Sequence, residues 1–169
     1  KVIVGKSANK TVIFSGDLKY VVLSPYWVIG GSILAKETLP AVKKNSSYLS
    51  KHNMEVVTRT NPTKVVNPST INWSKYTASN FPYIIRQKPG PSNSLGYVKF
   101  LFPNSYSIYL HDTPSRNLFD KEGRTFSHGC IRIEEPAWLA NYLLRNDSNW
   151  NEESIDKVMH GGKEKYVTL

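Results

Sequence analysis

A single cysteine and a histidine upstream of it are the residues of this chain whose types and spacing suit covalent chemistry. Cys130 is the only cysteine, and His111 precedes it by 19 positions. A free thiol has a pKa of about 8.5, so little thiolate forms at neutral pH unless a nearby imidazole takes the proton. The pair therefore predicts acyl transfer, with Cys130 as nucleophile and His111 as base.

The residues just before the cysteine suit a third part of such a site. Gly129 has no Cβ, so its backbone can adopt conformations that other residues avoid. We expect the main-chain N–H groups of Gly129 and Cys130, and as a further candidate that of His128, to point at the oxyanion that develops during acyl transfer. Nucleophile, base and charge stabiliser would then lie together.

Short strands are expected to position these side chains. Residues 107–110 alternate between polar and apolar types and lead directly into His111, while Ile131–Ile133 alternates apolar and basic residues. Residues 97–102 also alternate, and the Pro103-Asn104-Ser105 turn predicts a hairpin that aims the histidine. Both reactive groups should therefore lie where a strand meets a loop.

The same patterns predict the other elements. We expect a hairpin formed by residues 2–4 and 11–14, strands at 20–23 and 81–86, and a broken helix at 41–54 with Thr38 as a candidate cap. Two further helices are expected, one from Pro136 and one over 151–160 that is capped by Asn151.

Two short motifs contain the reactive residues: His111-Asp112-Thr113 and the run from Ser127 to Arg132. In these motifs the chain resembles the L,D-transpeptidases, the YkuD-type catalytic domains that remodel bacterial peptidoglycan. The resemblance continues upstream in residues 87–91, 93–96, 99–100 and 102–104. It is closest to the larger Gram-negative-type members, which carry a capping insertion.

This resemblance implies a fold and an activity. The fold would be mainly β, a sandwich or barrel with a few peripheral helices, and residues 36–75 would form a capping or lid insertion within a single catalytic domain spanning residues 1–169. Cys130 would attack the carbonyl between meso-diaminopimelate and the terminal D-Ala of a tetrapeptide stem. The side-chain amine of a neighbouring diaminopimelate would then take the acyl group, which gives a 3→3 cross-link. No cofactor is implied, and carbapenem-type β-lactams are expected to acylate the thiol.

The resemblance also suggests roles for the neighbours of the reactive pair. Arg132 would meet a stem-peptide carboxylate through its planar donors, unless it is only an outward-facing strand residue. Ser127 and Asp112 are further substrate-binding candidates, and Asp112 could instead orient His111 through its backbone or side chain. The alternative role for His128 is to shape the pocket rather than to move protons.

Three alternatives keep part of this picture. With water as acceptor the domain would be an L,D-carboxypeptidase, and with a lipoprotein lysine it would be a tethering enzyme. A basic wall-binding module with an inactive site is the third. A zinc site built from His111, Asp112, His128 and Cys130 has the right ligand types, but no second cysteine and no known metal-binding spacing.

Composition sets the outer limits. The 169 residues suffice for one well-packed domain, and 22 basic against 13 acidic side chains give a net charge of +9, which favours anionic partners such as a cell wall. No basic run or RNA- or DNA-binding motif indicates nucleic acid. No uninterrupted apolar segment of about eighteen residues is present. The abrupt start at Lys1 suggests a fragment of a longer protein, exported to the periplasm or cell envelope through a signal or anchor that this fragment lacks.

Overall fold

The computed structural model describes residues 1–169 as two compact units, each with its own β-sheet. The first unit joins Lys1–Pro25 to Pro89–Leu169, and the second is Tyr26–Lys88. Two sheets with few helices make the protein mainly β, which confirms the predicted fold class. The second unit is wider than the expected insertion at 36–75 and contains all of it. That this segment acts as a cap stays a prediction.

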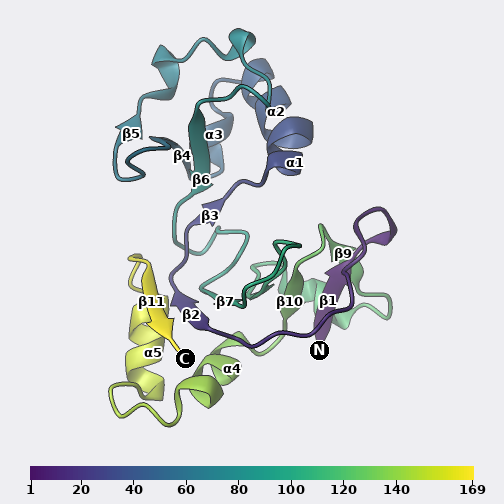
Figure 1. Cartoon of the computed structure of the whole chain (residues 1–169), viewed down its shortest axis with the longest axis vertical. Coiled ribbons are helices and arrows are strands. Elements are labelled where there is room, and N and C mark those ends of the chain that lie inside the picture. The colour runs from purple at the N-terminus through teal and green to yellow at the C-terminus, as the bar shows by residue number, and fades with distance from the viewer. The chain divides into compact units, whose positions relative to one another are not determined.

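A seven-stranded sheet with the order β11-β2-β7-β8-β10-β1-β9 forms the first unit. Its strands are β1 Val2–Gly5, β2 Tyr20–Leu23, β7 Val98–Leu101, β8 Leu110–His111, β9 Thr125–Ser127, β10 Ile131–Ile133 and β11 Lys165–Thr168. Strand β10 runs parallel to β8 and antiparallel to β1, so the strand after Cys130 lies between the histidine strand and the start of the chain. Figure 1 shows β1, β9 and β10 together beside the end marked N.

Two helices close the core of this unit. Helix α4 is Pro136–Leu144 and helix α5 is Glu152–Met159. Asn151 and Ser154 form a reciprocal capping box at the start of α5, which confirms the predicted cap at Asn151. The two helices bury Ala140, Leu144, Ile155 and Met159 against the sheet residues Val21, Leu23, Val98 and Phe100. The shorter 3₁₀ segments are η1 Ser7–Asn9 and η5 Arg116–Asp120.

The second unit pairs a four-stranded sheet with a helical run. The strands, in the order β3-β6-β4-β5, are β3 Trp27–Val28, β6 Tyr83–Gln87, β4 Met54–Thr58 and β5 Val65–Val66. The helical segments are α1 Gly31–Ile33, η2 Leu34–Thr38, α2 Leu39–Lys44, α3 Tyr48–Lys51, η3 Pro68–Thr70 and η4 Trp73–Lys75. Leu39, Val42, Leu49, Val56 and Phe81 are among the side chains of its separate core. No helix of the protein has the length and apolar character that crossing a bilayer would need.

Two expected strands are corrected by the structure. Residues 11–14 form no strand, and β1 pairs instead with β10 on one side and β9 on the other, so both of its edges are occupied. The Thr11 side chain donates a hydrogen bond to the Gly129 carbonyl. Residues 107–109 are also irregular: Ser107 has φ of 55°, and the Asn104 side chain hydrogen-bonds the backbone on both sides of Ile108. The pairing of β7 with β8 that aims His111 is confirmed.

The helix near Pro40 also differs from the expectation. It begins at Gly31 rather than after Thr38, and Thr38 has helical dihedrals with no side-chain cap. A proline within a helix removes one hydrogen bond and crowds the carbonyl four residues earlier. The chain accommodates this by widening into a π-helical turn over Leu34–Thr38.

Candidate active site

The register of β8 and β10 places Arg132 beside His111. The two residues are paired directly in this parallel ladder, as are Ile131 and Leu110, so Arg132 and His111 lie on the same face of the sheet. The Ile131 N–H donates to the Tyr109 carbonyl at 3.1 Å, which holds the residue before β8 against the start of β10. The Tyr109 ring lies 5.7 Å from that of His111, and both Tyr109 and Arg132 interact with the Cys130 thiol.

The opposite face of the same strands is apolar. Ile133 belongs to the core of the first unit, and Leu110 and Ile131 pack against that core. This alternation fixes the register, because a slip of one residue would expose the apolar side chains and bury the polar ones. Packing of isoleucine and leucine thus sets the face on which Arg132 and His111 lie.

His111 is held as a neutral base. Its side chain is buried, and its Nδ1 lies 2.5 Å from the Asp112 carbonyl oxygen. A carbonyl only accepts, so Nδ1 carries the hydrogen and Nε2 keeps its lone pair. Burial lowers the pKa of His111 to about 4; the bond to Asp112 opposes this shift and the positive charge of Arg132 adds to it.

Cys130 is partly exposed and its thiol form is favoured. Burial raises the pKa of Cys130, while hydrogen bonds from the main chain and side chain of Tyr109, and the charge of Arg132, act in the opposite direction. The sulfur also lies 3.7 Å from the Ser107 carbonyl oxygen. With both partners uncharged at neutral pH, the arrangement suits proton transfer from thiol to imidazole during attack on a carbonyl.

The turn before Cys130 is held by side-chain hydroxyls. The Ser127 hydroxyl donates to the Cys130 carbonyl at 2.6 Å and accepts from the Gly129 N–H at 3.1 Å. Thr11 donates to the Gly129 carbonyl at 2.8 Å and accepts from the Gly5 N–H at 2.9 Å. Gly129 has φ of 122°, in the region that favours glycine, so the predicted need for glycine here has a structural cause.

These bonds bear on the expected oxyanion donors. The Gly129 N–H is already engaged by Ser127, whereas the Cys130 N–H takes part in none of the main-chain bonds of this turn. Cys130 is therefore the better placed of the two donors. The buried Ser127 uses its hydroxyl inside the turn, and its contact with substrate stays a prediction. His128 is exposed.

Arg132 is half-buried beside the reactive pair. Its Nε is buried without a hydrogen-bond partner, and burial lowers the pKa of its guanidinium although the nearby Cys130 opposes that shift. A buried unpaired donor costs about 1–3 kcal/mol. An incoming acceptor at this position would recover that free energy. The structure contains no group of three or more His, Cys, Asp or Glu side chains that could hold a metal ion.

Asp112 and Tyr109 are the neighbours whose positions the sequence left open or missed. The Asp112 carboxylate is buried and bonded within the chain, and its main-chain carbonyl is the group that orients His111. Tyr109 was not predicted, although it lies two residues before His111 in an alternating segment, which was the signal that it shares a face with the histidine.

Comparison with known proteins identifies the family. Residues 1–158 match the YkuD family, described as the L,D-transpeptidase catalytic domain. The chain belongs to this L,D-transpeptidase family. It is 36% identical over 163 residues to a Haemophilus influenzae protein named "Putative L,D-transpeptidase", covering 96% of this chain. The chain spans about a third, 32%, of the length of that relative.

Membership of the L,D-transpeptidase family agrees with the geometry at Cys130 and His111. The matched region includes both residues, every strand of the sheet except β11, and the inserted unit Tyr26–Lys88.

Proposed function

We propose that this domain is a cysteine-dependent L,D-transpeptidase that forms 3→3 cross-links between peptidoglycan stems in the cell envelope. The observation that supports the proposal is the pairing of β8, which ends at His111, with β10, which begins directly after Cys130, together with the bond from Nδ1 of the imidazole to the Asp112 carbonyl. Because Nδ1 is engaged in this bond, Nε2 is the nitrogen that would act as the base.

The proposed cycle has two acyl-transfer steps. His111 Nε2 takes the thiol proton as Cys130 Sγ attacks the carbonyl between meso-diaminopimelate and D-Ala, and the oxyanion is met by the Cys130 N–H. Collapse breaks the C–N bond, and D-Ala leaves with the proton from His111. The amine of a second diaminopimelate then attacks the thioester, gives its proton to His111, and the thiol is restored.

Arg132 supports the choice of an anionic substrate. Its unpartnered Nε donor and its position on the reactive face suit a stem-peptide carboxylate. The net charge of +9 favours approach to an anionic polymer at longer range.

The decisive experiment is incubation of the domain with purified disaccharide-tetrapeptide, followed by mass spectrometry. We expect loss of D-Ala and formation of a dimer, and no reaction with Cys130→Ala. Monomeric tripeptide alone would indicate a carboxypeptidase. Transfer only to an added lysine-containing acceptor peptide would indicate a tethering enzyme, and unchanged tetrapeptide would indicate a binding module. A longer form of the protein should be run in parallel, since the relative is about three times as long.

A further inference from the structure

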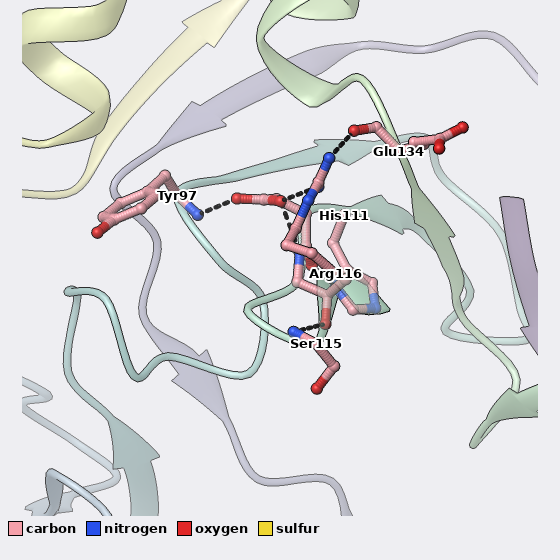
Figure 2. A network of polar contacts seen from close by, with 7 residues as sticks. Tyr97, His111, Ser115, Arg116 and Glu134 are labelled. Atoms are coloured by element: carbon pink, nitrogen blue, oxygen red, sulfur yellow. Dashed lines mark hydrogen bonds and ion pairs between the residues drawn. The ribbon is translucent and has the colours of Figure 1, made fainter. Parts of the chain in front are cut away.

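Arg116 links the segment after the histidine to the segment after the cysteine strand. Its Nη1 lies 3.1 Å from Asp112 Oδ1, and its Nη2 donates to the main-chain carbonyl of Glu134. Figure 2 shows the contact between the Arg116 guanidinium and Glu134 as a dashed line. Because Glu134 directly follows β10, one side chain fastens the ends of the two strands that position His111 and Cys130.

The Asp112 carboxylate is fixed from several directions. Oδ2 accepts from the Tyr97 N–H at 2.9 Å, and Oδ1 accepts from the Thr113 N–H at 2.7 Å as well as from Arg116. Gly96 makes room for it: a Cβ there would lie 2.2 Å from Asp112 Oδ2. With its side chain held in this way, Asp112 has little freedom to rotate its own carbonyl, the acceptor for His111 Nδ1.

We propose that Arg116 is a positioning residue for the reaction: by holding the Asp112 carboxylate and the Glu134 carbonyl together, it fixes the Asp112 carbonyl that orients the His111 imidazole. The inference rests on the proposed function. Arg116 contacts no reacting atom, so its effect is on the geometry of the base. A small misorientation of a catalytic group can lower turnover by up to about 100-fold.

The chain offers a matched control. Arg145 resembles Arg116 in its local contacts: each donates to a main-chain carbonyl and lies over an aromatic ring, Tyr142 for Arg145 and Phe119 for Arg116. Only Arg116 also binds a carboxylate, and Arg145 lies after α4, outside the network in Figure 2. Arg116→Ala, Arg116→Lys and Arg145→Ala should therefore be compared.

Turnover of stem peptide is the first readout. We expect Arg116→Ala to lower kcat about 10- to 100-fold with KM within about twofold of wild type. Arg116→Lys should recover part of the loss, because one ammonium can bind Asp112 but lacks the fork that also reaches Glu134. Arg145→Ala should stay within about twofold of wild type. A loss of thermal stability in Arg116→Ala with kcat unchanged would show a merely structural role and overturn the proposal.

The second readout does not need a peptidoglycan substrate. In ¹⁵N-labelled protein, the His111 ring should show a hydrogen-bonded Nδ1–H signal that Arg145→Ala retains and Arg116→Ala loses or broadens. Retention of the wild-type signal in Arg116→Ala would overturn the proposal. If wild type converts no stem peptide while the signal changes as expected, the proposed function fails and the positioning of His111 by Arg116 stands.

Discussion

The imidazole of His111 donates its Nδ1 hydrogen to the carbonyl of Asp112, the next residue in the chain. The histidine therefore presents Nε2 as a base without any carboxylate bonded to its ring. Burial lowers the pKa of His111 and raises that of Cys130, so the resting pair is neutral at pH 7. In such a pair the thiol loses its proton to the imidazole only as a substrate carbonyl arrives.

Activity should persist well below the pH at which an ordinary histidine becomes protonated. The pKa of His111 is about 4 rather than 6.5, so kcat/KM for stem peptide should fall on the acid side with a midpoint near pH 4. A pH series from 3.5 to 8 with fixed ionic strength measures this midpoint. A midpoint near 6.5 would contradict a buried, neutral resting imidazole.

The free energy of unfolding should decrease as the pH is lowered through a window set by His111. The folded pKa of about 4 lies below the ordinary 6.5, so the unfolded chain binds more protons between these values and unfolding becomes easier as the pH drops from 6.5 to 4. The change is up to about 3 kcal/mol. Urea unfolding of wild type and His111→Gln at pH 7, 5.5 and 4.5 isolates it. Equal pH slopes for the two proteins would be the contrary result.

Gly96 should not tolerate a side chain. Its φ is 60°, and an added Cβ would lie 2.2 Å from Asp112 Oδ2. We expect Gly96→Ala to lower the free energy of unfolding by about 1–3 kcal/mol and to reduce kcat through displacement of Asp112. Gly123→Ala is the control, since nothing lies within 4 Å of the Cβ added there. Equal effects of the two substitutions in unfolding and kinetic assays would refute this reasoning.

Ser127 should act through the shape of the turn before the nucleophile. Ser127→Ala removes the bonds to the Cys130 carbonyl and the Gly129 N–H, so we expect a loss of about 1–2 kcal/mol in stability and about tenfold in kcat. Ser69→Ala also removes a bonded hydroxyl, but in the second unit, and should leave kcat unchanged. An effect of Ser127→Ala confined to KM would instead indicate direct substrate binding.

A carbapenem should form one covalent adduct, at Cys130. Attack of the thiol on the β-lactam carbonyl opens the ring without a leaving group at that step, so the intact mass should rise by the mass of the whole inhibitor. Intact-mass measurement of wild type and Cys130→Ala tests this directly. An adduct that forms equally on Cys130→Ala would place the reaction elsewhere.

The strands next to the reactive residues were predictable because local patterns determine them. Alternation at Ile131–Ile133 and the Asn151 cap of α5 follow from neighbouring residues, and both predictions are confirmed. The partners of β1 were not predictable, because Val2 pairs with Ile133 across more than a hundred residues. The missing strand at 11–14 has the same cause: distant strands occupy both edges of β1, so residues 11–14 have no edge to pair with there.

The candidate site shows the same division. Motif and residue type indicated Cys130 and His111 as the reactive pair, whose roles remain to be tested. The sequence did not reveal Tyr109 beside the thiol or the link from Arg116 to Glu134, because both depend on the parallel register of β8 and β10. Such register is set by packing against the core, which no short stretch of residues encodes alone.

Strand β1 lies between β10 and β9, which places the first residues of the chain inside the sheet next to the cysteine turn. Closing so long a loop is entropically unfavourable and slow compared with forming local contacts. During refolding, amide protons of β1 and β10 should therefore become protected from exchange after those of α4 and α5. The protein would acquire its reactive centre as one of its last folding events.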